Sequence, residues 1–118
     1  MPDRSGHDHR RLGAHGEDRA LRWYVERGYE LVERNWRCAT GEIDLVLRQD
    51  GTVVFCEVKT RSSARFGSPL EAVGRDKQRR LRRLAATWLA TSDVGYRSVR
   101  FDVAAVIGSR VEVVEGAF

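Results

Sequence analysis

Cysteine is scarce in this sequence, and long apolar runs are absent from it. The 118 residues include only Cys38 and Cys56, too few for a disulfide-stapled fold and without the spacing of a metal-binding motif. We therefore expect two free, partly buried thiols. No apolar run approaches the roughly 20 residues that a membrane-spanning helix needs, and the polar N-terminus lacks the apolar stretch of a signal peptide. We expect no membrane association and a cytoplasmic location.

Hydrophobic residues make up 42% of the chain and charged residues 32%, which is typical of a folded globular protein rather than of a disordered one. A length of 118 residues fits one domain with one core. The net charge is +4 and the pI is about 9.6. This basic balance favours an anionic partner, but the position of the charges matters more than their sum.

The hydrophobic pattern divides the chain into a short tail and one folded unit. Residues 1–11 are polar and charged, and they predict a flexible N-terminal tail. Residues 12–118 predict a single domain with helices packed on a sheet, in the order α-β-β-β-α-β-β. Ser68–Glu71 resembles a helix capping box. The predicted helices cover residues 12–28 and 76–91, and the predicted strands cover residues 29–37, 42–48, 52–61, 96–107 and 110–114.

Asp50-Gly51 is a strong signal for a two-residue hairpin turn between the second and third strands. With that turn, Asp44 lies directly opposite Glu57, with Cβ atoms roughly 4.5–5.5 Å apart. Two carboxylates at that distance need a compensating charge, which a hard divalent cation such as Mg²⁺ supplies. Alternation groups the side chains by face: Glu42, Asp44 and Val46 together, Ile43, Leu45 and Leu47 opposite them, and Val53, Phe55, Glu57 and Lys59 on one face of the third strand.

Lys59 projects from the same face as Glu57 and is expected to orient a water molecule or to stabilise charge on a phosphate. Glu17 falls on the inward edge of the first helix, where it can pair with an arginine, reach towards solvent or reach a metal ion. The alternative to a site is a solvent-exposed sheet face decorated with charges. Val53 and Phe55 on the same face argue against it, because they indicate that this face is covered.

Several motifs in order resemble the YraN-like uncharacterised protein family of bacteria. The two main ones are Gly41–Leu45 (GEIDL) and Phe55–Arg61 (FCEVKTR). The supporting segments are Gly16–Ala20, Arg34–Trp36, Phe66–Gly67, Lys77–Leu81 and Arg100–Val103. The resemblance runs from about Leu12 to the C-terminus.

That family is similar to the PD-(D/E)XK nuclease superfamily of restriction enzymes and Holliday-junction resolvases. The resemblance implies an α/β fold with a restriction-endonuclease-like core, a mixed central β-sheet flanked by helices. It places Asp44 at the first Asp of the signature, Glu57-Val58-Lys59 at its (D/E)XK, and Glu17 at the helical acid of the resolvase-like branch. Ile43 stands where the signature has proline. The implied catalytic residues are Asp44, Glu57, Lys59 and Glu17, and the three acids are the implied metal ligands.

The start of the second predicted helix is strongly basic. Such a cluster can neutralise phosphates and would make binding sensitive to salt, although a solvated helix face is the plainer interpretation. Lys77 and Gln78 lie one turn before Leu81 and are expected to point towards the acids. Asp102 on a closing strand is interpreted as a structural ion-pair partner rather than a ligand. The candidate nucleic-acid-binding residues are Arg75, Lys77, Gln78, Arg79, Arg80, Arg82 and Arg83.

The sequence thus predicts a nuclease that uses Mg²⁺ or Mn²⁺ to hydrolyse phosphodiester bonds, with DNA as the expected partner. So short a chain has little surface for reading a base sequence, which favours cleavage that depends on DNA structure. A symmetric homodimer would suit a branched substrate. Two rivals stay open: a nucleic-acid-binding protein that keeps the fold without cleaving, and an adaptor whose basic helix meets an acidic protein.

Overall fold

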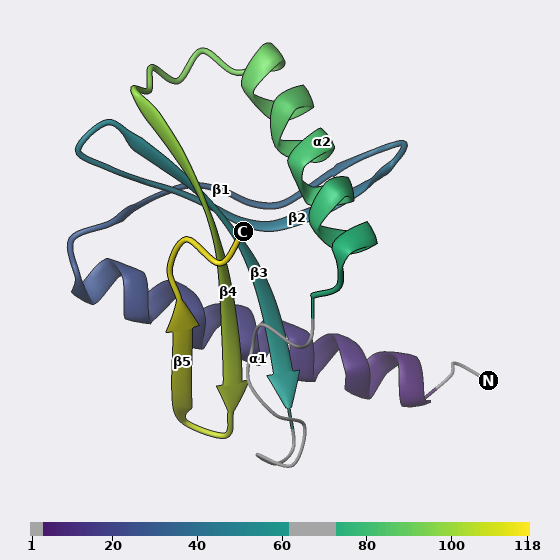
Figure 1. The fold of residues 1–118 in the computed structure, drawn as a ribbon. Coiled ribbons are helices and arrows are strands. Elements are labelled where there is room, and N and C mark those ends of the chain that lie inside the picture. The colour runs from purple at the N-terminus through teal and green to yellow at the C-terminus, as the bar shows by residue number, and fades with distance from the viewer. Residues whose placement is uncertain (1–3, 62–72) are drawn as a thin grey trace.

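A computed structural model describes residues 4–61 and 73–118 of the chain, and the side chains of residues 13–61 and 73–118 (Figure 1). The element order is that predicted from the sequence, which confirms an α/β fold with a mixed sheet. The elements are α1 (Arg4–Glu26), β1 (Glu30–Cys38), β2 (Gly41–Gln49), β3 (Thr52–Arg61), α2 (Arg75–Thr91), β4 (Ser98–Ile107) and β5 (Arg110–Val114).

The five strands form one sheet in the order β1-β2-β3-β4-β5. Neighbouring strands run antiparallel except for β3 and β4, which are parallel and are connected through α2. A parallel pair needs such a crossover, because its two strands start at the same end of the sheet. Figure 1 shows β3 and β4 side by side at the centre, with the β1–β2 hairpin extending beyond them.

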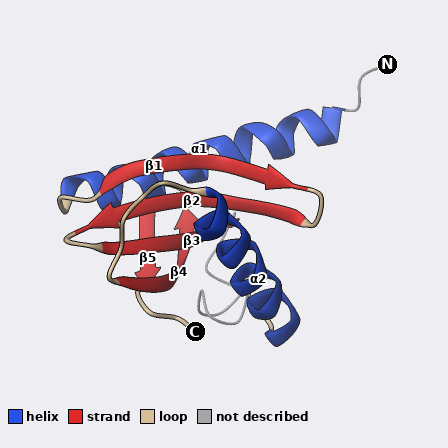
Figure 2. Ribbon diagram, turned by 90° about the horizontal axis from the view of Figure 1, so that it is seen from above, coloured by secondary structure: helices blue, strands red, loops and turns tan. Residues whose placement is uncertain are grey.

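The sheet lies between the two helices, with α1 on one face and α2 on the other (Figure 2). Ala20 and Tyr24 of α1 are fully buried against one face. Leu84 and Trp88 of α2 are buried against the other. Burial on both faces explains why β2, β3 and β4 are rich in valine and leucine. Among the described residues, neither helix is long and apolar enough to cross a membrane.

The Asp50-Gly51 turn and its register are confirmed. Both residues have positive φ, 50° at Asp50 and 81° at Gly51, as a type I′ hairpin turn requires. The pairing runs from Gln49 opposite Thr52 to Leu45 opposite Cys56. The predicted pairing of Asp44 opposite Glu57 would be the next step of this register, and it does not form. The ladder between β2 and β3 ends at Leu45, so the start of β2 is free to turn away from β3.

The strict alternation predicted for β2 is wrong at its first residues. Ile43 packs in the core cluster on the α2 side together with Val46, whereas alternation places these two residues on opposite faces. Leu45 and Leu47 pack on the α1 side, opposite to Val46, as alternation predicts. The change occurs where β2 loses its ladder with β3. A strand without that ladder can twist, and its side chains are redirected.

Helix α1 begins at Arg4, eight residues before the predicted start. Residues 4–11, predicted to be part of a flexible tail, are therefore helical in the structure. Once a helix exists, each added residue gains a backbone hydrogen bond, so a polar segment without proline can extend it. The other predicted boundary signal, Ser68–Glu71, lies outside the described residues. The residue preceding α2 is Gly74, which makes no side-chain cap hydrogen bond.

Candidate functional site

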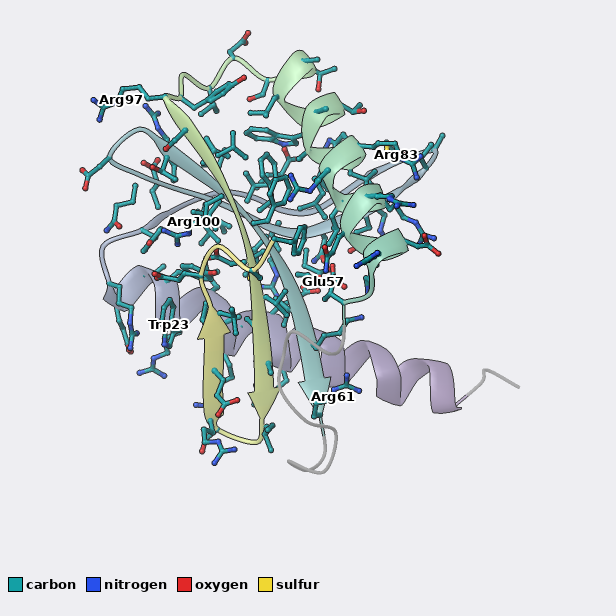
Figure 3. The ribbon with its side chains drawn as sticks, viewed as in Figure 1. Trp23, Glu57, Arg61, Arg83, Arg97 and Arg100 are labelled. Carbon is teal, nitrogen blue, oxygen red and sulfur yellow. The ribbon has the colours of Figure 1, made fainter. Side chains whose placement is uncertain are left out.

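Glu57 is buried on β3 and is held by two lysines. Its Oε1 lies 2.6 Å from Lys77 Nζ of α2 and 3.3 Å from Lys59 Nζ of its own strand. Figure 3 shows Glu57 where β3 passes the N-terminal end of α2. Burial lowers the pKa of Lys77, but hydrogen bonds to Glu57 and Lys59 and the charges of Glu57 and Asp44 together outweigh burial and raise it. The pKa of Lys59 is lowered by burial and by the neighbouring Lys77.

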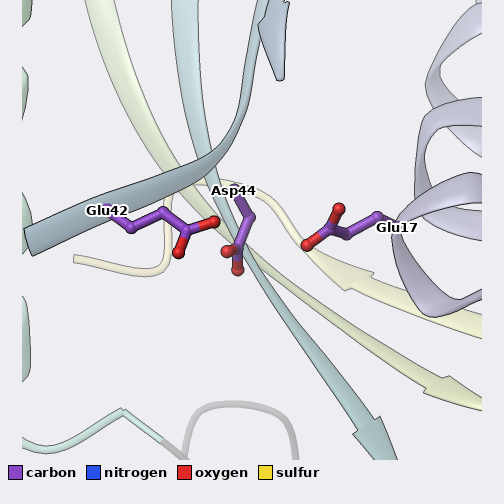
Figure 4. A group of neighbouring side chains, drawn as sticks. All are labelled: Glu17, Glu42 and Asp44. Carbon is purple, nitrogen blue, oxygen red and sulfur yellow. The ribbon is translucent and has the colours of Figure 1, made fainter. Parts of the chain in front are cut away.

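Three other carboxylates gather beside this network. Glu42 and Asp44 of β2 and Glu17 of α1 each place a carboxylate oxygen within 4.8 Å of those of the other two. Figure 4 shows the three side chains pointing towards one another from their two elements. An octahedral Mg²⁺ holds oxygens about 2.1 Å away, so its opposite ligands lie about 4 Å apart. A small movement of these side chains would therefore suit a hard divalent cation.

The pKa of the Asp44 carboxyl is raised well above its usual range. Burial raises its pKa to about 7, and the nearby charges of Glu57, Glu17 and Glu42 add to this effect. The backbone N–H of Val58 donates a hydrogen bond to Asp44 Oδ2 at 2.8 Å and opposes the shift. A carboxylate in this position gains from a nearby cation, because a positive charge relieves both the burial and the repulsion.

Glu17 pairs with an arginine, one of the roles that the sequence left open, and lies next to the acids of β2. Its Oε1 accepts a hydrogen bond from Arg34 Nε at 3.2 Å, and its carboxylate also faces Asp44 and Glu42. Gly16 brings it there, because a Cβ at residue 16 would collide with Thr60 Oγ1 of β3. Without that close approach of α1 to the sheet, Glu17 would stand further from the acids of β2.

Glu42 was not predicted as a site residue. It lies in the acidic group, and its Oε2 also pairs with Arg37 Nε at 3.3 Å. The sequence contained a signal for it, since Glu42 is two residues from Asp44 on the same strand and alternation gives both one face. We predicted Asp44, Glu57 and Glu17 as the metal ligands. The structure brings Glu17 and Glu42 around Asp44, and sets Glu57 on the other side with the lysines.

A cavity of about 220 Å³ joins the two groups. Asp44, Glu57 and Lys77 line it, together with Arg80. A second cavity of about 430 Å³ reaches Asp44 and Glu42 from the side of Glu17. Asp44 and Glu42 thus lie between two openings, one lined by basic side chains and one reaching α1. A charged substrate and a metal ion could approach Asp44 from different sides.

The predicted basic residues of α2 separate into distinct environments. Lys77 reaches Glu57, as expected, whereas Gln78 donates to the carbonyl of Val73 at 3.1 Å and does not contact the acids. Arg80 lines the smaller cavity, and the Arg82 guanidinium lies 5.4 Å from the centre of the Phe101 ring. The remaining predicted residues are exposed: Arg75, Arg79 and Arg83.

We expect Asp44→Asn to stabilise the metal-free protein at pH 8 by up to about 4 kcal/mol, because each pKa unit corresponds to about 1.4 kcal/mol, and to have little effect near pH 4. The Asp44 pKa of about 7 lies above the value of about 3.9 in an unfolded chain. The folded state therefore binds more protons between pH 4 and 7, and its stability falls as the pH rises through this range. Asparagine removes that penalty and can still accept the Val58 hydrogen bond. Urea unfolding at both pH values measures the difference, and an equal change at both would contradict the expectation.

Comparison with known proteins identifies one family. The model of Uncharacterised protein family UPF0102 matches residues 16–106. A UPF0102 protein of Beutenbergia cavernae is 60% identical over 99 residues, covering 84% of each chain. A UPF0102 protein of Nocardia farcinica is 50% identical over 85% of this chain and 79% of its own. A UPF0102 protein of Moorella thermoacetica is 49% identical over 92% of this chain and 96% of its own. The matched region contains all four acids and both lysines of the site.

Proposed function

The chain belongs to Uncharacterised protein family UPF0102, and we propose that it is a divalent-metal-dependent nuclease that hydrolyses phosphodiester bonds in DNA. The observation that carries this proposal is that a group of acidic side chains and a glutamate–lysine ion pair meet at one cavity. Glu42 and Asp44, two of the three clustered carboxylates, line this cavity together with the Glu57–Lys77 ion pair. This combination suits a metal ion beside a phosphate. It matches the pattern of the PD-(D/E)XK nucleases that the sequence resembles.

Asp44 is the centre of the proposed metal site, with Glu42 and Glu17 beside it and Glu57 completing the acidic set. A bound Mg²⁺ or Mn²⁺ would act as a Lewis acid and lower the pKa of a water bound to it. Glu57 holds the ammonium group of Lys59 next to the acids. From there Lys59 can orient the attacking water or stabilise charge developing on the phosphate. Lys77 neutralises Glu57 and can contact a phosphate entering the cavity.

The exposed arginines of α2 supply a surface for the nucleic-acid backbone next to this cavity. Arg80 lines the cavity itself, and Arg79 and Arg83 lie on the same helix. Contacts of this kind neutralise phosphates without reading bases. We therefore propose recognition by DNA structure, with branched DNA as a suitable substrate and a homodimer as a suitable assembly.

Binding without cleavage is the second candidate function. The Lys77–Glu57 ion pair favours it, because Lys77 Nζ lies only 2.6 Å from an oxygen that a metal would otherwise take. If this pair persists when nucleic acid binds, Glu57 Oε1 is not available to ligate a metal. The basic face of α2 would then hold DNA while the acids stay metal-free.

A nuclease panel tests the proposal. Single-stranded, duplex, flapped and four-way DNA, and RNA, are incubated with the protein in Mg²⁺, in Mn²⁺ and in EDTA. We expect cleavage of at least one DNA substrate with metal, none in EDTA, and none by Asp44→Asn. Salt-sensitive binding without any cut would support the second candidate. Cleavage that persists in Asp44→Asn would show that another protein in the preparation makes the cut, and would overturn the assignment of the site.

A further inference from the structure

A basic pocket lies on α1, away from the acidic site. Its volume is about 450 Å³, within the range of small-ligand pockets. One wall is the second half of α1, and the other is formed by the turn between β4 and β5 and the start of β5. Figure 3 shows Trp23 of this wall on α1, far from Glu57. The residues that matter for its chemistry are Arg19, Arg22, Trp23, Glu26, Arg27 and Ser109.

Arg27 and Trp23 form a stacked pair in this pocket. The Arg27 guanidinium carbon lies 3.8 Å from the centre of the Trp23 ring. Arg27 Nη1 also donates a hydrogen bond to the Trp23 carbonyl at 2.9 Å, which holds the guanidinium against the ring. Unpaired bases stack on aromatic rings and on arginine guanidinium groups. The pair therefore offers a preformed stacking surface.

The charge of the pocket favours an anion. Three arginines face one acid, Glu26, which pairs with Arg22 at 3.1 Å. Arg19 has no acidic partner among the residues that the structure describes, so its charge is uncompensated. Arginine presents a rigid fork of donors that suits a phosphate group. Ser109 adds a hydroxyl from the opposite wall.

The two walls of the pocket are connected. His15 Nε2 lies 3.3 Å from the carbonyl oxygen of Gly108 and ties α1 to the β4–β5 turn. Leu21 and Trp23 of α1 and Val111 and Val113 of β5 pack against the same buried cluster. The spacing between the arginines and Ser109 is therefore maintained by the fold. A pocket held in this way loses little entropy when a ligand binds.

We propose that this pocket binds an unpaired nucleotide of a nucleic-acid strand, with the phosphate on Arg19 and Arg22 and the base on Arg27 and Trp23. An acidic peptide would use the arginines but would leave the stacking pair without a partner. Trp23 is six residues beyond Glu17, about 9 Å along the helix axis and on a different side of it. The pocket would thus hold a single strand outside the metal site. The inference rests on the proposed function in taking nucleic acid as the ligand.

Fluorescence anisotropy with a labelled single-stranded oligothymidine in EDTA tests the pocket without any cleavage. We expect Arg27→Ala to weaken binding roughly tenfold, within the range measured for loss of one stacked base. The slope of log affinity against log salt should stay nearly unchanged, because Arg27 is proposed to hold the base and not a phosphate. Arg27→Lys keeps the charge but loses the flat guanidinium, so affinity should fall while the slope stays. Arg97→Ala, at the opposite end of the sheet, is the control and should leave both unchanged.

Arg19→Ala gives an independent readout, because this side chain is not part of the stacked pair. It should lower the slope of log affinity against log salt by about 0.7, as loss of one phosphate contact predicts for a single strand, whereas Arg27→Ala should not. Equal affinity for wild type, Arg27→Ala and Arg19→Ala would overturn the proposal. So would displacement of the oligonucleotide by polyglutamate at equal charge concentration, because the pocket would then recognise charge alone. Weakened binding in these variants with no cleavage by the wild type would support the pocket and count against the nuclease.

Discussion

Asp102→Ala is expected to lower the free energy of unfolding by roughly 3–5 kcal/mol, the usual cost of removing one partner of a buried charged pair. The Asp102 side chain is fully buried. It accepts hydrogen bonds from the Tyr24 hydroxyl at 2.6 Å, from Arg100 Nε at 2.9 Å and from the Gly116 N–H at 3.0 Å. Alanine would leave all three donors without this acceptor. The prediction of a structural ion-pair role for Asp102 agrees with its bond to Arg100.

Urea unfolding with linear extrapolation measures this loss. Tyr24→Phe is the matched control, because it removes one donor and keeps the carboxylate with its other two partners. Burial raises the pKa of Tyr24, so its hydroxyl stays protonated and donates. We expect this variant to lose about 1 kcal/mol. A loss below about 1 kcal/mol for Asp102→Ala would mean that the network contributes little, and that the burial of Asp102 needs another explanation.

Lys59→Ala is expected to reduce cleavage by roughly 10²–10³-fold, the effect of removing one well-placed electrostatic group from an active site. Lys59 Nζ lies 3.3 Å from Glu57 Oε1 and projects from the strand that carries Glu57. Burial and Lys77 lower its pKa, and its N–H groups can donate hydrogen bonds to a water or to a phosphate oxygen. The Lys59 ammonium group is therefore placed to act on the reacting atoms rather than to bind remote phosphates.

Lys77→Ala provides the comparison, because Lys77 also contacts Glu57 but comes from α2. We expect it to raise KM more than it lowers kcat, as a group that holds the phosphate would. Steady-state cleavage of the best substrate from the panel separates the two variants. A larger fall in kcat for Lys77→Ala than for Lys59→Ala would exchange the roles of the two lysines. Circular dichroism of both variants excludes loss of the fold as the cause.

Local sequence signals predicted most of the fold. The Asp50-Gly51 turn needs positive φ at both residues, and few sequences tolerate that, so the register of the β2–β3 hairpin could be predicted. The second helix was predicted within one residue of its observed start, because its apolar stripe is regular and Thr91 ends it. The start of α1 was missed, because polar residues carry no periodic signal and the helix extends through them.

The candidate site was predicted in part. Asp44, Glu57 and Lys59 were found through hairpin register and alternation, which are local rules. Alternation also places Glu42 on the face of β2 that carries Asp44, but Glu42 was not predicted as a site residue. The nuclease signature needs only one acid on this strand, and Asp44 fills that position. Lys77 was expected to point towards the acids from its place on the second helix, but its pairing with Glu57, twenty residues earlier in the chain, depends on the packing of α2 on the sheet.

The sequence by itself determined the order of the elements and the register of the β2–β3 hairpin as far as Leu45 opposite Cys56. These depend on interactions between residues close in the chain, which turn chemistry and periodicity specify. The sequence also predicted that Glu17 and Lys77 approach the acids. Only the tertiary structure decided their partners, with Glu17 beside Asp44 and Glu42 and Lys77 on Glu57. It alone formed the arginine–tryptophan pocket against the β4–β5 turn. Which side chains meet in this way depends on how the helices pack on the sheet. No local sequence pattern specifies the distance between a helix and a strand.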